Sequence, residues 1–236
     1  MTEDQQAAVL PIWPAGASRE HIDARIELAR AEQRLHDQLW QVAEARRKLP
    51  PGPVLGDYLL AEGPADLGLD GPVTTTAVRD LFGAHETLFV YHLMFHPDDD
   101  AACPMCSLWV DSLHGVAHHI GRHTAFAVIG KAPLPKLRAW ALRRGWDGLR
   151  ILSSYGTTFN ADMNVEKPDG AQRPVVSVFT SDGDQVRHVV SQSANFLDDA
   201  EGANDLLTPI WHVLDLLPGG RGDWYADNSY AGRSRS

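Results

Sequence analysis

A long stretch near the start of the chain carries apolar residues on one helical face. Ser18 stands in the N-cap position, basic residues at 46–48 occupy the last turn, and a Pro-Pro-Gly-Pro run at 50–53 ends the pattern. The spacing predicts an N-terminal arm over residues 1–53 that contains a long amphipathic helix. Its expected role is structural, or a contact that joins two copies of the chain into a homodimer. The apolar positions are Ile22, Ile26, Ala29, Leu35, Leu39 and Val42.

Residues 54–236 show a different pattern, in which short apolar runs alternate with helical segments. The runs 87–95 and 124–129 are apolar almost throughout, which is typical of strands covered on both faces. The step Asp182-Gly183 signals the turn of a late hairpin. After a Gly- and Pro-rich stretch with one or two helical turns at 78–82, the predicted order is strand 87–95, helix 103–120, strand 124–129, helix 134–144, strand 149–152, hairpin strands 175–179 and 186–190, and helix 206–217.

This order of elements indicates an α/β fold class. Two buried strands joined through helices, followed by a hairpin, match a thioredoxin-like central mixed sheet flanked by helices. Other doubly wound folds share the same alternation, so the pattern alone does not separate them. The position of the cysteine pair, between a strand and a helix, narrows the choice, and we predict a thioredoxin-like domain over residues 54–236, preceded by the helical arm.

Composition and charge limit the classes of partner that the protein is expected to bind. The chain has 236 residues and a formal net charge of −10, which argues against nucleic acid because phosphate binding needs a basic face. The acidic start is not followed by an apolar core of signal-peptide length. The longest apolar stretch, 87–95, is too short to span a bilayer, which takes about 20 residues. We expect a cytoplasmic protein with no membrane partner, whose cysteines are kept as thiols.

The two cysteines of the chain, Cys103 and Cys106, stand three residues apart at the predicted junction of a strand and a helix. This spacing suits a redox dithiol, half of a metal site, or two unrelated buried thiols. At a helix start, unpaired N–H groups and the helix dipole favour a thiolate, and Pro104 suits the first helical position. The nearby carboxylates at 98–100 disfavour the thiolate, because their charge is also negative. In the redox interpretation Cys103 is the nucleophile, Cys106 resolves the mixed disulfide, and no cofactor is needed.

The alternative is a non-catalytic module that binds a metal or ligand through the cysteines and nearby histidines. Seven of the eleven histidines fall within residues 85–123, and His96 could approach the cysteines through the loop that follows its strand. However, Cys106 and His114 lie eight residues apart on one helix, roughly 12 Å at the helical rise. Gly115 occupies the position where a metalloprotease motif needs Glu. The spacing therefore favours a dithiol without a bound metal.

A peroxiredoxin site is a further alternative with a recognisable pattern. Its peroxidatic cysteine lies in the motif Pro-x-x-x-Thr-x-x-Cys. Around Pro97 and Cys103 the spacing differs and the threonine is missing. The segment is closer to a dithiol site than to a peroxidatic one.

A series of motifs resembles a bacterial thioredoxin-like family known as domain of unknown function 899. The resemblance begins at Tyr91-His92-Leu93-Met94-Phe95, continues through Cys103-Pro104-Met105-Cys106-Ser107, and covers roughly residues 20–230. It implies a thioredoxin-like fold and a dithiol–disulfide oxidoreductase acting on a protein or small-molecule disulfide or thiol. Family members usually have a small residue where this chain has Met105, so Met105 is expected to tune reactivity. Further matching motifs lie at 131–134, 144–146, 153–154, 159–162, 177–179 and 214–223.

Three residues outside the cysteine motif are candidates for shaping the site. In thioredoxin-like proteins a proline at the position of Pro174, often with a cis peptide bond, faces the cysteine pair. The alternative is that Pro174 only begins an edge strand. Asn160 and Asp162 lie in a loop expected on the same rim as Cys103, where they could order the site or bind substrate. Caps and turns built from such residues are the alternative role.

Overall fold

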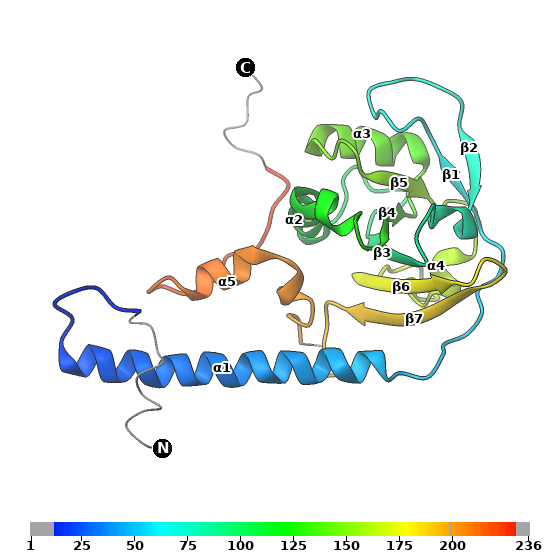
Figure 1. The fold of residues 1–236 in the computed structure, drawn as a ribbon. Helices are drawn as coiled ribbons and strands as arrows, with labels where there is room; N and C mark the ends of the chain where they lie inside the picture. Colours follow the sequence, from blue (N-terminus) through cyan, green and yellow to red (C-terminus); the bar gives the residue numbers. More distant parts are fainter. Residues whose placement is uncertain (1–11, 199, 230–236) are drawn as a thin grey trace. The chain divides into compact units, whose positions relative to one another are not determined.

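The computed structural model describes residues 12–198 and 200–229. The chain divides into two compact units, Met1–Pro50 and Pro51–Ser236. In the first unit, helix α1 runs over Arg19–Arg47 (Figure 1), and the Ser18 side chain accepts a hydrogen bond from His21 N at 3.1 Å. The predicted cap is therefore confirmed. No residue of α1 is buried.

The second unit contains a seven-stranded mixed sheet. Its order is β2-β1-β5-β4-β3-β6-β7. Strands β3, β4 and β5 run parallel, while β6 and β7 form an antiparallel hairpin beside β3 and β1 pairs antiparallel with β5. The strands are β1 (Leu59–Glu62), β2 (Thr74–Ala77), β3 (Thr87–Leu93), β4 (Ala125–Gly130), β5 (Arg150–Ser153), β6 (Val175–Ser181) and β7 (Val186–Ser193).

Helices cover both faces of this sheet. Helices α2 (Pro104–Ile120) and α3 (Leu134–Arg144) pack on one face, in a buried cluster that also holds Tyr91 and Leu93 of β3. The turn η2 (Val78–Leu81) and the short helix α4 (Phe159–Asp162) pack on the other face, with Leu88 and Val90. Both faces of β3 are therefore buried, which explains why its sequence is almost wholly apolar.

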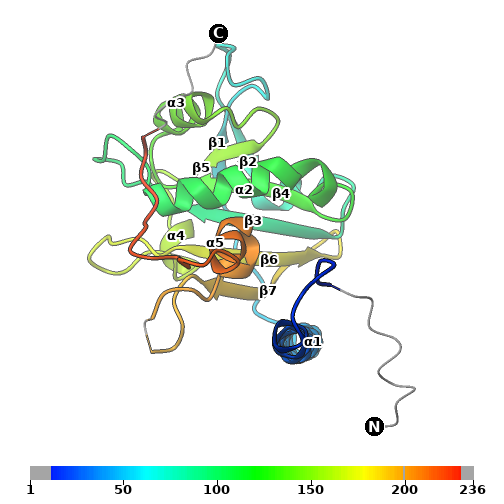
Figure 2. The ribbon, with the colours of Figure 1, turned by 90° about the vertical axis from the view of Figure 1, so that its left-hand side faces the viewer.

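The last elements pack beside α2. The turn η3 (Asp205–Leu207) and helix α5 (Pro209–Asp215) follow the hairpin, and Figure 2 shows α5 next to α2 in front of the sheet. The hydroxyls of Ser112 in α2 and Thr208 lie 2.6 Å apart. The sequence pattern predicts a single helix over 206–217, whereas the structure has η3 and α5 there. Pro209 interrupts it, because proline has no N–H to continue the helical hydrogen bonds.

Two parallel crossovers, β3-α2-β4 and β4-α3-β5, followed by the β6–β7 hairpin, make this a thioredoxin-like α/β fold. The predicted class is therefore confirmed. The sequence pattern missed the hairpin of β1 and β2 within 54–86. Only Leu60 of its eight residues is buried, and β2 reads Thr-Thr-Thr-Ala, so apolar periodicity gave no signal there.

Candidate functional site

The fold places the cysteine pair where β3 gives way to α2. Cys103 is the N-cap residue of α2 and Pro104 its first helical residue. Cys103 N donates to the carbonyl of Met94 at 2.9 Å, which fixes the loop back onto the end of β3. Cys103 Sγ in turn accepts a hydrogen bond from Cys106 N at 3.5 Å. The sulfur thus takes up one of the N–H groups that a helix start leaves unpaired.

The two thiols lie in unequal surroundings. Both are free, Cys103 is partly exposed and Cys106 is buried. The side-chain hydrogen bond with Cys106 lowers the pKa of Cys103 to about 6, against the opposing effects of burial and of the Glu201 charge. The backbone N–H groups of Cys106 and Met105 lower it further. The same pairing, together with burial, raises the pKa of Cys106 well above its usual range. The geometry places the negative charge on Cys103 and keeps the proton on Cys106.

A buried tyrosine completes the surroundings of Cys106. Tyr91 of β3 is 2% exposed, and its hydroxyl forms a side-chain hydrogen bond with Cys106. Burial and the neighbouring sulfur raise the pKa of Tyr91 well above its ordinary value, so the phenol keeps its proton. The sequence contains a usable signal, because a tyrosine in a buried and mostly apolar strand needs a polar partner.

Two buried side chains hold the backbone of Cys103. Ser107 Oγ donates to the carbonyl of Cys103 at 3.0 Å, and Trp140 Nε1 of α3 donates to Ser107 Oγ at 3.1 Å. This chain of hydrogen bonds links α3 to the start of α2. No local pattern indicates this contact, since the two partners lie 33 residues apart in the chain.

A pocket of about 650 Å³ opens beside Cys103. His96 and Pro104 line it from the loop and the helix start. Gln172 forms another wall, and its Oε1 accepts a hydrogen bond from Phe95 N at 2.9 Å. Asn228 comes from the C-terminal segment, which Figure 2 shows in red at the start of α2, and its Nδ2 donates to Ala102 O at 2.9 Å. Three segments far apart in sequence therefore build the pocket.

The other predicted residues lie at varying distances from this pocket. Met105 is half-buried and packs against the cluster that contains Cys106. Pro174 is half-buried before β6, its carbonyl accepts from Ala194 N at 2.8 Å, and no peptide bond within the described residues is cis. Pro174 does not line the pocket, although Gln172 two residues earlier does.

Asn160 and Asp162 are held elsewhere, in α4. Asn160 Oδ1 accepts from Ser154 Oγ at 2.6 Å, and the Asp162 carboxylate accepts from the hydroxyl of Tyr58 at 3.0 Å. Phe159 of the same helix packs in the cluster on the sheet face opposite to Cys106. The structure does not bring these two side chains into the pocket.

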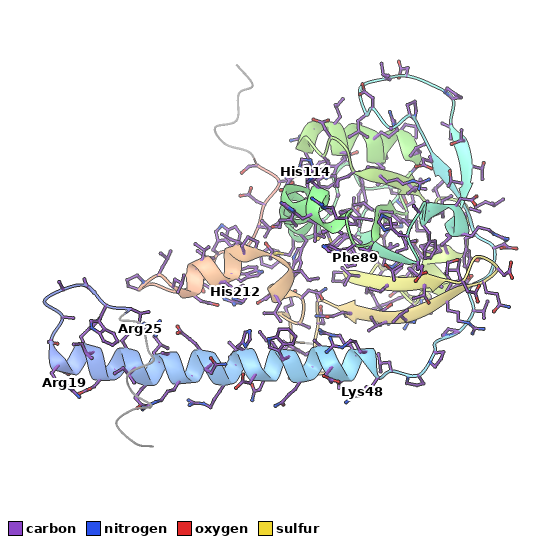
Figure 3. All side chains as sticks on the ribbon, in the orientation of Figure 1. Arg19, Arg25, Lys48, Phe89, His114 and His212 are labelled. Carbon is purple, nitrogen blue, oxygen red and sulfur yellow. The ribbon has the colours of Figure 1, made fainter. Side chains whose placement is uncertain are left out.

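The histidines do not gather around the cysteines. His114 of α2, labelled in Figure 3, lies with Nε2 3.0 Å from the carbonyl of Asp147. His92 is buried against Phe159, with Nε2 2.9 Å from Ser177 Oγ. Over residues 12–198 and 200–229, no group of three or more His, Cys, Asp or Glu side chains could hold a metal ion.

Among the helices in those ranges, none is long and apolar enough to cross a membrane.

Several solved structures share features of this fold. The reduced 2-Cys peroxiredoxin of Plasmodium vivax is 14% identical, with a TM-score of 0.48 over 66% of this chain and 78% of that one. AhpC of Mycobacterium bovis is 13% identical, with a TM-score of 0.47 over 77% of this chain and 98% of that one. Peroxidoxin BcpB of Mycobacterium tuberculosis is 19% identical, with a TM-score of 0.45 over 67% of this chain and 94% of that one. Likenesses at this level do not identify the chemistry of the site.

Comparison with curated proteins gives no match. The family model described as bacterial protein of unknown function, DUF899, matches residues 13–234. That range includes α1, the cysteine pair and the C-terminal segment, and it agrees with the motifs seen in the sequence. The chain therefore belongs to the DUF899 family.

Proposed function

We propose that this protein is a thiol–disulfide oxidoreductase that uses Cys103 and Cys106. The observation that carries the proposal is the unequal pair. The hydrogen bond from Cys106 lowers the pKa of Cys103 to about 6, so that about nine-tenths of it is thiolate at pH 7. An ordinary cysteine, with a pKa of about 8.5, is only a few per cent thiolate there. A partly exposed thiolate beside a pocket, with a protonated buried thiol one turn away, suits disulfide exchange.

The reaction takes two exchanges. The Cys103 thiolate attacks one sulfur of a substrate disulfide, forms a mixed disulfide with that half and releases the other half as a thiolate, which takes a proton from water. Cys106 then gives up its proton and attacks Cys103 Sγ, and the second half of the substrate leaves and is protonated. The protein loses two electrons and the Cys106 proton, solvent supplies the second proton, and one substrate disulfide becomes two thiols. A dithiol reductant restores the protein by the reverse exchange.

The surrounding residues have separate roles in this proposal. The Tyr91 hydroxyl donates to the Cys106 sulfur as that sulfur becomes a thiolate in the second exchange. Pro104 and His96 shape the wall of the substrate pocket. Met105 supplies a backbone N–H that favours the Cys103 thiolate. Pro174 holds the start of β6 in place, two residues after the pocket residue Gln172, through its carbonyl bond to Ala194 N. None of these steps needs a cofactor.

Redox titration of the full chain, with alkylation and mass spectrometry, tests the proposal. We expect a reversible Cys103–Cys106 disulfide and preferential alkylation of Cys103 near neutral pH. The variant Cys106→Ser should trap mixed disulfides on Cys103, whereas Cys103→Ser should trap none. Failure to form a reversible disulfide would overturn the proposal. So would stoichiometric zinc or copper held by the thiols of protein purified without a His-tag.

Two further features belong to the same proposal. We place the protein in the cytoplasm, where glutathione and thioredoxin systems keep dithiols reduced between turnovers.

We also propose that α1 joins two copies of the chain. Its exposed residues Leu28, Leu35 and Val42 recur at intervals of seven, the spacing of a helix-pairing seam.

A further inference from the structure

The charge of the pocket beside Cys103 is of one sign. Besides the Cys103 thiolate, the lining residues with a formal charge at neutral pH are Asp99 and Asp169, both carboxylates. Neither forms an ion pair within residues 12–198 and 200–229, although Asp169 Oδ1 accepts a hydrogen bond from Ala171 N at 3.0 Å. Glu201 is close enough for its charge to oppose the Cys103 thiolate.

Basic residues lie near this pocket without lining it, among them Lys136, Lys167 and Arg173. The Lys136 ammonium donates to the carbonyls of Pro97 and Asp99 at 2.6 Å each and lies 5.8 Å from the centre of the Phe95 ring. It does not line the pocket. The charges in the lining itself are those of two carboxylates and the Cys103 thiolate, so a substrate entering the pocket meets a negative field.

The walls also carry amide groups with unused hydrogen-bonding capacity. Gln172 Nε2 and Asn228 Oδ1 are buried and have no partner within the described residues. The other atoms of these two amides hold the pocket together through Phe95 and Ala102. An unmet donor and an unmet acceptor each cost free energy, and a peptide group carries the complementary carbonyl and N–H. A pocket of this volume is also large enough for more than a bare disulfide.

We propose that the substrate of this site is a peptide or protein disulfide flanked by neutral or basic residues, and that anionic disulfides are disfavoured. The inference rests on the proposed thiol–disulfide exchange and names its substrate class. Attack by the Cys103 thiolate on one substrate sulfur releases a thiolate inside the same negative field. A positive group beside that sulfur therefore assists both entry of the substrate and departure of the leaving thiolate.

Three small disulfides of similar size provide the first test. Cystamine carries two positive charges, bis(2-hydroxyethyl) disulfide none, and 3,3′-dithiodipropionate two negative charges. The rate at which each oxidises the reduced full chain is divided by its rate with dithiothreitol, which corrects for intrinsic reactivity. We expect the corrected rate to fall in the order given, by about tenfold between the extremes at low salt, and the difference to shrink as salt screens the charges.

Matched variants show whether the pocket causes the preference. Asp99→Asn with Asp169→Asn should reduce the ratio between cystamine and dithiodipropionate several-fold, and the asparagine oxygen at 169 can still accept from Ala171 N. The control pair, Asp70→Asn with Asp184→Asn, changes the net charge equally outside the pocket lining. It should leave the ratio unchanged. A ratio unaltered by the pocket pair overturns the inference.

A neutral peptide-like probe tests the amide walls. The bis-amide of N,N′-diacetylcystine carries peptide groups and no charge, so its corrected rate should exceed that of bis(2-hydroxyethyl) disulfide several-fold. Equal corrected rates would overturn the assignment to peptide disulfides, and equal rates for the three charged and uncharged probes would overturn the charge preference. In both cases disulfide exchange itself would stand. If none of the disulfides oxidised the protein, the proposed function would fall as well.

Discussion

At the scale of single residues, the difference between the cysteines follows from their positions in one helical turn. Cys103 ends the loop and is partly exposed, so its sulfur can receive hydrogen bonds from the N–H groups of the helix start. Cys106 lies one turn further into the cluster beneath α2, where burial disfavours a charge. One shared hydrogen bond then shifts the two pKa values in opposite directions.

The first prediction concerns the origin of the thiolate. The largest effect that lowers the pKa of Cys103 is its side-chain hydrogen bond with Cys106. Alkylation of Cys103 by iodoacetamide should be half-maximal near pH 6 in the wild type. In Cys106→Ala the midpoint should rise by about one to two pH units, since hydrogen bonds to charged groups contribute about 1.5–3 kcal/mol. An unchanged midpoint would show that the helix start alone stabilises the thiolate.

A second prediction separates the two exchanges. Tyr91→Phe removes the hydroxyl that hydrogen-bonds the Cys106 sulfur, so attack by Cys103 should keep its rate and resolution by Cys106 should slow by about tenfold. Acid quenching and mass spectrometry would show the mixed disulfide persisting. Tyr58→Phe is the matched control, because that hydroxyl bonds Asp162 on the other face of the sheet. Equal lifetimes of the mixed disulfide in both variants would exclude the role of Tyr91.

At the scale of elements, helix α2 contains a glycine that lowers the stability of the helix. Gly115 stands in its exposed middle, and a Cβ added there meets nothing within 4 Å. Gly115→Ala should therefore stabilise the protein by about 1 kcal/mol, the difference in helix propensity. Gly145 ends α3 with φ +73°, a left-handed conformation, so Gly145→Ala should destabilise by a comparable amount. Urea unfolding of both variants checks the opposite signs, and a loss of stability in Gly115→Ala would contradict the prediction.

Elements with strong periodicity could be predicted from the sequence, whereas contacts between distant segments could not. The helix at Leu134–Arg144 was predicted to the residue because its start follows Pro133 and its end precedes Gly145. The position of the cysteine pair followed from the apolar run before it. Local pattern contains no information on which loops meet, so it could not show that Gln172 and Asn228 wall the pocket. Nor could it show that the Asn160 side chain bonds Ser154 rather than lining the pocket.

At the scale of the whole molecule, a chain of polar side chains crosses three strands of the sheet, from the buried His92 to the exposed Ser191. His92 Nε2 of β3 lies 2.9 Å from Ser177 Oγ of β6, which lies 2.7 Å from Ser191 Oγ of β7. His188 Nε2 contacts the same Ser191 hydroxyl at 2.7 Å. Burial lowers the pKa of His92 to about 3, with a smaller effect from His188, so the fold requires a neutral imidazole in its interior.

This requirement predicts a loss of stability in acid. Below pH 6.5 the unfolded chain binds a proton at residue 92, while the folded chain does not until about pH 3. The contribution is therefore complete above pH 6.5 and is lost as the pH falls toward 3, by up to about 1.4 kcal/mol per unit. Urea unfolding from pH 7 to 4 should give a shallower loss for His92→Leu. His188→Leu should flatten the profile less, because His188 is less buried. Parallel profiles for wild type and His92→Leu would refute the prediction.

The exposed apolar residues of α1 predict that two copies of the chain associate through this helix. Both buried clusters lie within the second unit, whereas Leu28, Leu35 and Val42 of α1 are 53%, 57% and 47% exposed. Exposed large side chains at seven-residue intervals are stabilised when a second helix covers them. Sedimentation equilibrium should find a dimer that Leu35→Glu weakens at least tenfold, while Gln33→Glu, on the opposite side of the helix, leaves it intact. Residues 51–236 alone should be monomeric and keep the Cys103 alkylation profile. A dimer that survives this truncation would remove α1 from the interface.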